Sequence, residues 1–228
     1  MDYLTAEAAK GTYDSVLHVG DCMYLFHYPL YVSPFIDFFL PHKWLTKTKT
    51  LYKFISAGAY DFDGLASLIG NGFMTLAQGY MAIKPTAVVE GNHEACGACI
   101  ASDPRFESGN FTQYKMRFHS VSLNSNTGNN RYYSFNRGIT HFIVFSAEAY
   151  LYARSEAFLS NQLAFMSADL AAVDRKATPW VVALCHKDWT METEAFNAFT
   201  PVLLQNKVDV LFVGHVYVTS LSHIYDQE

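Results

Sequence analysis

Side chains that commonly bind metal ions follow four short apolar segments of this 228-residue chain. They are Asp21 after SVLHV, Asn92 after AVV, His186 after VVALC and His215 after VDVLFV. A carboxylate, an amide oxygen and two imidazoles form a mixed oxygen and nitrogen set, which suits zinc, manganese or iron better than calcium. Glycine directly precedes three of the four residues, where it lets the backbone turn sharply. These residue types predict a divalent-metal site, provided that the fold brings the four positions together.

Near-continuous apolar segments alternate with helical patterns along the chain. Apolar runs of this length are typical of strands buried on both faces, and they predict strands at Ser15–Val19, Ala87–Val89, Tyr132–Phe135, His141–Ser146, Val181–Cys185 and Val208–Val213. Apolar residues that recur every three or four positions predict helices over 64–81, 157–174 and 195–205. Strands that alternate with helices indicate an α/β layered fold, whose sites gather beyond the carboxyl ends of strands.

Charge and composition limit the classes of partner. The formal net charge is −5 at pH 7, and no run of Lys and Arg suggests binding to nucleic acid or to an anionic membrane. The most membrane-like stretch, residues 24–40, is interrupted by two prolines, a histidine and an aspartate. A spanning helix needs about 20 nearly uninterrupted apolar residues. We therefore expect one globular domain with no nucleic-acid partner and no membrane span.

The four cysteines are too few for a fold built on disulfide bonds. Cys96 and Cys99 have the spacing of a zinc-binding pair, but no second pair of Cys or His residues matches them. We therefore expect ordinary thiols or a local disulfide.

The order of these motifs resembles that of the calcineurin-like metallophosphoesterases and, more narrowly, of the purple acid phosphatases. Along the chain come GDCMY at 20–24, GNHE at 91–94, an apolar strand ending in His186, and GHVY at 214–217. The resemblance implies an α/β fold of the metallophosphoesterase type, a layered β-sandwich of two mixed sheets flanked by helices. It also implies a single domain over residues 1–228 that lacks the first strand of that fold and is truncated at both ends.

The resemblance assigns roles to individual residues. Asp21 corresponds to the carboxylate that bridges two metal ions. Asn92, His186 and His215 would complete the divalent half of the centre, which holds zinc, manganese or iron. His93 would lie just outside the metal ligands, where it positions the phosphate or protonates the leaving alkoxide. A tyrosine would bind ferric iron in the other half of the centre.

Three departures from the family's pattern all concern the ferric half. The chain begins after the strand whose aspartate binds ferric iron in the family. An aromatic-rich insertion at about 24–58 separates GDC from AYDFDGL, so that Tyr24 and Tyr60 compete for the position of the tyrosine ligand. Tyr217 stands where the family has a histidine ligand. The insertion is either a retained intron or an aromatic loop folded over the mouth of the site. The ferric site is predicted to be incomplete.

The function that the resemblance implies is metal-dependent hydrolysis of small phosphate monoesters, impaired by the incomplete ferric site. One alternative is a non-catalytic or truncated relative that acts as an interaction module. Another is a phosphodiesterase or nucleotidase of the same superfamily, which the tyrosine of the Gly-Asp-x-x-Tyr motif disfavours. The resemblance further implies a secreted or vacuolar enzyme, although the first residues show no signal peptide.

Overall fold

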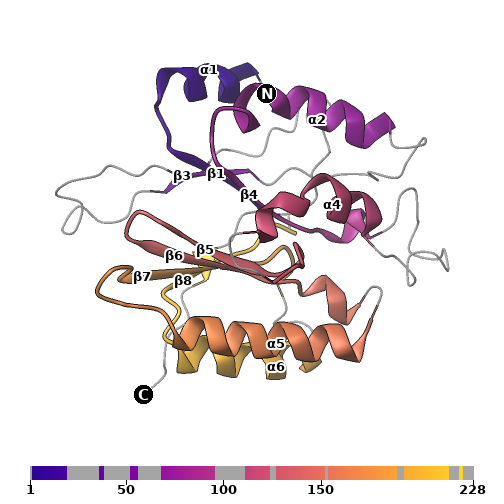
Figure 1. Ribbon diagram of the computed structural model, residues 1–228, viewed down its shortest axis with the longest axis vertical. Coiled ribbons are helices and arrows are strands. Elements are labelled where there is room, and N and C mark those ends of the chain that lie inside the picture. Colours follow the sequence, from indigo (N-terminus) through magenta and orange to yellow (C-terminus); the bar gives the residue numbers. More distant parts are fainter. Residues whose placement is uncertain are drawn as a thin grey trace.

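The structure contains two β-sheets packed face to face, with helices on both outer faces (Figure 1). This computed structural model describes residues 2–19, 36–38, 52–55, 68–95, 111–123, 127–151, 154–188, 193–215 and 221–222. The arrangement confirms the predicted fold class, a layered sandwich of two mixed sheets flanked by helices. Within the described ranges, no helix combines the length and the apolar character needed to cross a membrane.

Sheet A has the strand order β2-β3-β1-β4. Its strands are β1 (Ser15–Val19), β2 (Ile36–Phe38), β3 (Tyr52–Ile55) and β4 (Thr86–Val89). β1 is parallel to both of its neighbours, β3 and β4, whereas β2 is antiparallel to β3. The outer face of the sheet packs against α1 (Asp2–Lys10), α2 (Leu68–Met81) and α4 (Thr112–Arg117).

Sheet B has the strand order β5-β6-β7-β8-β9. Its strands are β5 (Tyr133–Arg137), β6 (Thr140–Val144), β7 (Trp180–Leu184), β8 (Val210–Phe212) and β9 (Leu221–Ser222). The three central strands are parallel, and β5 and β9 are antiparallel to their neighbours. Helices α5 (Glu156–Ala171) and α6 (Thr193–Gln205) cover the outer face (Figure 1). Short 3-10 helices are η2 (Asn92–Glu94), η3 (His119–Ser122) and η4 (Glu148–Tyr150).

Side-chain alternation explains why the strand sequences are almost continuously apolar. In β1, Leu17 and Val19 belong to the core between the two sheets, whereas Val16 belongs to the core beneath the helices. In β7, Val182 faces the other sheet and Val181 faces the helices. Because successive side chains point to opposite faces, and both faces are covered, nearly every position of such a strand is buried.

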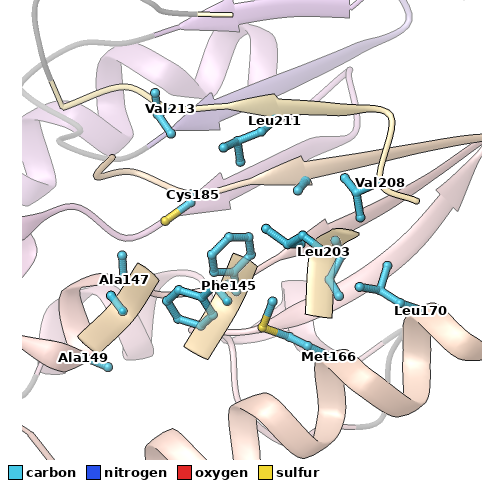
Figure 2. Close-up of a cluster of buried hydrophobic side chains, with 14 of the residues drawn as sticks. Phe145, Ala147, Ala149, Met166, Leu170, Cys185, Leu203, Val208, Leu211 and Val213 are labelled. Carbon is cyan, nitrogen blue, oxygen red and sulfur yellow. The ribbon is translucent and has the colours of Figure 1, made fainter. Parts of the chain in front are cut away.

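Figure 2 shows the core between sheet B and helices α5 and α6. α5 contributes Leu159, Met166 and Leu170, which recur on one face of the helix. α6 contributes Phe199 and Leu203, one turn apart. Each of these five side chains is at most 5% exposed, so this layer holds α5 and α6 firmly against the sheet that carries two of the predicted ligands.

The stretch predicted as an insertion, residues 24–58, contributes two described segments to sheet A. They are β2 and β3, and β3 pairs with β1 on the side opposite β4. The sequence pattern does not predict these strands, because a charged residue interrupts each short apolar run, Asp37 in β2 and Lys53 in β3. The helices predicted from periodicity correspond to α2, α5 and α6, with shifted ends.

Candidate metal centre

The carboxyl ends of β4, β7 and β8 hold three of the predicted metal ligands. Asn92 opens η2 shortly after β4, His186 follows β7, and His215 follows β8. Asn92 is 7% exposed and His186 is 1% exposed, whereas His215 is half-buried. One ligand therefore comes from sheet A and two come from neighbouring strands of sheet B.

His186 lies at the centre of this cluster. Its Nδ1 is 2.8 Å from the main-chain oxygen of Val19, the last residue of β1. Its Nε2 is 3.1 Å from Asn92 Oδ1 and 3.2 Å from His215 Nδ1. The two imidazole rings meet edge to face, with centroids 5.1 Å apart and an interplanar angle of 77°. The ends of β1, β4, β7 and β8 thus converge on one place.

The hydrogen bonds of His186 determine which of its ring nitrogens carries the proton. A main-chain carbonyl only accepts, so Nδ1 donates to Val19 O and, in the neutral ring, Nε2 is left as an acceptor. That acceptor faces the amide oxygen of Asn92, which is also an acceptor. The Val19 carbonyl thus fixes the tautomer, whereas the amide orientation, with Oδ1 toward Nε2, is the one that a bound cation favours. Lone pairs directed at a common space repel one another, and a bound cation relieves that repulsion.

The separations between the donor atoms fit a divalent cation. Two donors about 2.1 Å from one ion, separated by an angle of about 90–109°, lie roughly 3.0–3.4 Å apart. Both separations measured from His186 Nε2, 3.1 Å and 3.2 Å, fall within this range. The bond from Nδ1–H to a carbonyl is also the contact by which metal-binding histidines are commonly oriented. One amide oxygen and two imidazoles therefore fit zinc, manganese or iron.

Gly214 allows the end of β8 to approach the end of β1. A Cβ atom at this position would lie 2.5 Å from Val19 O and 2.8 Å from Val19 Cγ2, which is closer than carbon atoms tolerate. The N–H groups of Gly214 and His215 both donate to the main-chain oxygen of His186, at 2.8 and 2.9 Å. Glycine is thus required here by a close approach, and the approach places His215 beside His186.

The turn that carries Asn92 is closed by a buried carboxylate. Glu94, 3% exposed, accepts a hydrogen bond from the N–H of Gly91 at 2.6 Å. Behind the turn, Glu90 pairs with Arg131 in a second buried contact. The sequence does not predict this pair, because its members are 41 positions apart. The sequence does indicate that Glu90 has a partner, because this charged residue directly follows an apolar strand.

Five predicted site residues cannot be placed by the described part of the structure. Asp21, Tyr24, Tyr60 and Tyr217 lie outside the described residues, as does the side chain of His93, whose backbone belongs to η2. Within the described ranges, no group of three or more His, Cys, Asp or Glu side chains is arranged to hold a metal ion. The cluster found here combines two histidines with an amide, and its predicted carboxylate is Asp21.

Cys185 is adjacent to His186 in sequence but faces the opposite side of the sheet. Its side chain belongs to the core beneath α5 and α6 (Figure 2). Burial raises the pKa of the Cys185 thiol well above its usual range, so the sulfur stays protonated. Its Sγ donates to the main-chain oxygen of Lys187 at 3.4 Å. Cys185 is therefore an ordinary buried thiol, whereas Cys96 and Cys99 lie outside the described residues.

Comparison with known families agrees with this geometry. The profile of the calcineurin-like phosphoesterase family matches residues 2–218, a span that includes all four strand ends of the site. The chain belongs to the calcineurin-like phosphoesterase family.

Relatives within the family are purple acid phosphatases, which confirms the resemblance seen in the motifs. Purple acid phosphatase 23 of Arabidopsis thaliana is 32% identical over 151 residues, which cover 62% of this chain and 30% of the relative. Purple acid phosphatase 22 of the same plant is 31% identical over 172 residues, which cover 72% of this chain and 37% of the relative. Acid phosphatase type 7 of Homo sapiens is 27% identical over 187 residues, which cover 81% of this chain and 31% of the relative. The matched part of this chain thus spans about a third of the length of these relatives.

A solved structure shares the fold. The purple acid phosphatase PPD1 from yellow lupin (Lupinus luteus) seeds matches with a TM-score of 0.50 and 19% sequence identity. The match covers 66% of this chain and 28% of the lupin chain. At this level of identity the likeness concerns the fold alone, and it agrees with the two-sheet sandwich described above.

Proposed function

We propose that this chain is a metal-dependent hydrolase of small phosphate monoesters, similar in activity to an acid phosphatase. The main support is the convergence of Asn92 Oδ1, His186 Nε2 and His215 Nδ1 at the ends of strands from both sheets. Family membership supports cleavage of phosphoesters. The relatives named as acid phosphatases support monoesters as the substrate class.

The chain's own residues hold the metal donors in place. We propose that Asn92, His186 and His215 would hold a divalent ion and that Asp21 would supply the carboxylate of the centre. When bound, the ions polarise the phosphoryl oxygens and make water a stronger nucleophile. The bond from His186 Nδ1 to Val19 keeps Nε2 deprotonated and directed at the site.

The leaving group needs a proton, and we assign its delivery to His93. In the proposed reaction a water oxygen forms a bond to phosphorus, the ester P–O bond breaks, and the leaving alkoxide takes up a proton. His93 directly follows Asn92 in η2, so it stands next to a proposed ligand. A general acid in this place typically contributes about 10²–10⁴-fold to the rate.

We propose that the second, ferric position is weakly held, because Tyr217 stands where the family has a histidine ligand. Tyr24 and Tyr60 are the competing candidates for the remaining tyrosine ligand. The purified chain should then contain less iron than divalent metal and should lack the visible band of an iron-bound tyrosinate. Metal analysis and an absorption spectrum test this proposal, and a strong visible band would contradict it.

The function is tested with the full chain, loaded with zinc or manganese and assayed on p-nitrophenyl phosphate. We expect turnover that a chelator abolishes and that His215→Ala lowers at least about 100-fold, a loss of about 2.7 kcal/mol of transition-state stabilisation. His119→Ala is the matched control, because this exposed histidine lies in η3, away from the site. Absence of metal-dependent turnover would refute the proposal. Faster turnover of bis(p-nitrophenyl) phosphate would instead indicate a phosphodiesterase.

We further propose, from the resemblance to purple acid phosphatases, that the enzyme acts outside the cell or in the vacuole. Fractionation of cells that produce the natural protein tests this. Recovery in the cytosol would contradict it.

A further inference from the structure

A buried ion pair lies directly behind the candidate metal centre. Glu90 follows β4 and is two residues from Asn92, and Arg131 precedes β5. Arg131 Nε donates to Glu90 Oε2 at 2.5 Å, and Arg131 Nη2 donates to Glu90 Oε1 at 2.8 Å. The Arg131 side chain is 7% exposed, and the Glu90 side chain is fully buried. The two parallel bonds define both the distance and the orientation of the carboxylate.

The position of the guanidinium is itself well defined. Its central carbon lies 4.0 Å from the ring centroid of Phe111 and 4.3 Å from that of Phe158. Arginine stacks on aromatic rings in this way because its charge is spread over a planar group. A buried ion pair adds little stability compared with apolar residues of similar volume, since both charges are removed from water. A role in fixing a nearby group explains the pair better than stability does.

Glu90 also connects the end of β4 to the other sheet. Ser146, just beyond β6, donates its hydroxyl to Glu90 Oε1. Gln162 of α5 holds Ser146 through two further bonds, from Ser146 N to Gln162 Oε1 at 2.8 Å and from Gln162 Nε2 to Ser146 O at 3.0 Å. The Glu90 carboxylate thus has donors on both oxygens, and each donor is fixed by packing or by additional hydrogen bonds.

Asn92 lies between two fixed points of the same turn. On one side the Glu90 carboxylate is held by Arg131, and on the other Glu94 accepts from Gly91 N at 2.6 Å. We propose that Arg131 is a positioning residue of the metal centre: by fixing Glu90, it holds Asn92 Oδ1 facing His186 Nε2. This inference rests on the proposed function, because it requires that Asn92 bind the metal ion.

Arg131→Lys tests the proposal in the full chain. Lysine keeps the positive charge but lacks the planar guanidinium group, so it cannot make both parallel bonds to Glu90 or stack on the rings of Phe111 and Phe158. We expect the dissociation constant for Zn²⁺ to rise by about 10–100-fold, as for other residues that orient metal ligands. With Co²⁺ in place of zinc, the visible spectrum should change because the amide donor is displaced, a readout that lower stability alone does not alter.

Arg175→Lys is the matched control. Arg175 donates to Asp209 Oδ2 at 2.7 Å and to Pro179 O at 3.0 Å. These contacts lie before β7 and β8, at the end of sheet B opposite the proposed centre. We expect this variant to lower the melting temperature without changing Zn²⁺ affinity or the Co²⁺ spectrum.

The outcomes separate the positioning role from the proposed function. If Arg131→Lys binds Zn²⁺ as tightly as the wild type with the same Co²⁺ spectrum, the positioning role is wrong although the metal site stands. If the wild type itself binds no Zn²⁺, the proposed function fails, and the positioning role fails with it. Should Arg131→Lys not fold, the double variant Arg131→Met, Glu90→Gln removes both charges together. It should fold, and it should show the same weakened metal binding.

Discussion

Replacing Gly214 with alanine is the sharpest single test of the candidate centre. The added Cβ would lie 2.5 Å from Val19 O, and contacts below 3.0 Å force a neighbour to shift. The Val19 oxygen belongs to the main chain, so the clash is removed only if the end of β8 moves away from β1 by about half an ångström. A displacement of about this size is the largest at which a functional site keeps its geometry. His215 is the next residue, and it would move with the strand.

The magnitude follows from this overlap. Inserting a methyl group into a packed site typically costs about 1–3 kcal/mol. If about half of that falls on the geometry of the metal donors, the affinity for a divalent ion falls by roughly 0.5–1.5 kcal/mol, and each 1.4 kcal/mol is about tenfold in the dissociation constant. We expect Zn²⁺ to bind Gly214→Ala about 2- to 10-fold more weakly than the wild type, as measured by competition with a chromogenic chelator.

Gly128→Ala separates weaker metal binding from lower stability. Gly128 has φ +64°, and a Cβ there would meet nothing within 4 Å, so alanine adds backbone strain without a clash. That strain costs about 1–2 kcal/mol, similar to the effect expected at Gly214. Both variants should melt earlier than the wild type, but only Gly214→Ala should lose zinc affinity. Equal zinc binding by Gly214→Ala and the wild type would refute the close approach of β8 to β1 as the feature that places His215.

Three further predictions concern the core and the helices. Burial, reinforced by the charge of Glu7, raises the pKa of Tyr13 from 10.0 to about 12. The folded state therefore holds the phenol proton more tightly than the unfolded state does. The stability that the protonated phenol contributes is present below pH 10 and is lost between pH 10 and 12. Urea unfolding of Tyr13→Phe should show a shallower loss over that window, by up to about 1.4 kcal/mol per pH unit, and an unchanged slope would contradict this. Gly79→Ala places a Cβ 2.4 Å from Thr5 Oγ1, where α2 crosses α1. It should lower the free energy of unfolding by about 1–2 kcal/mol, although alanine has the better helix propensity. In a double-mutant cycle, Thr5→Ala should restore most of this loss. Met166→Ala removes a fully buried side chain on the inner face of α5 and should cost about 2–5 kcal/mol in thermal unfolding, with zinc affinity retained. A loss below about 1 kcal/mol would show that this core is loosely packed.

The core strands and the meeting of three candidate metal ligands could be predicted from sequence for a physical reason. A strand buried on both faces is apolar at most positions, as in β7, and this leaves a plain signal in the sequence. Polar residues such as Asn92, His186 and His215 stand out where those runs end. The short strands β2 and β3 left no such signal, because Asp37 and Lys53 interrupt their apolar residues.

The sequence by itself determined which residue types stand at the strand ends, and through them the family and the class of metal ligand. Only the tertiary structure decided which atoms of those residues meet. The bond from His186 to Val19, across 167 positions, selects the ring nitrogen that faces the site. The contact of Gly214 with Val19 and the pairing of Arg131 with Glu90 likewise join residues far apart in the chain. Local sequence patterns report burial and turns between neighbouring residues, whereas donor placement depends on how two separate sheets pack against each other.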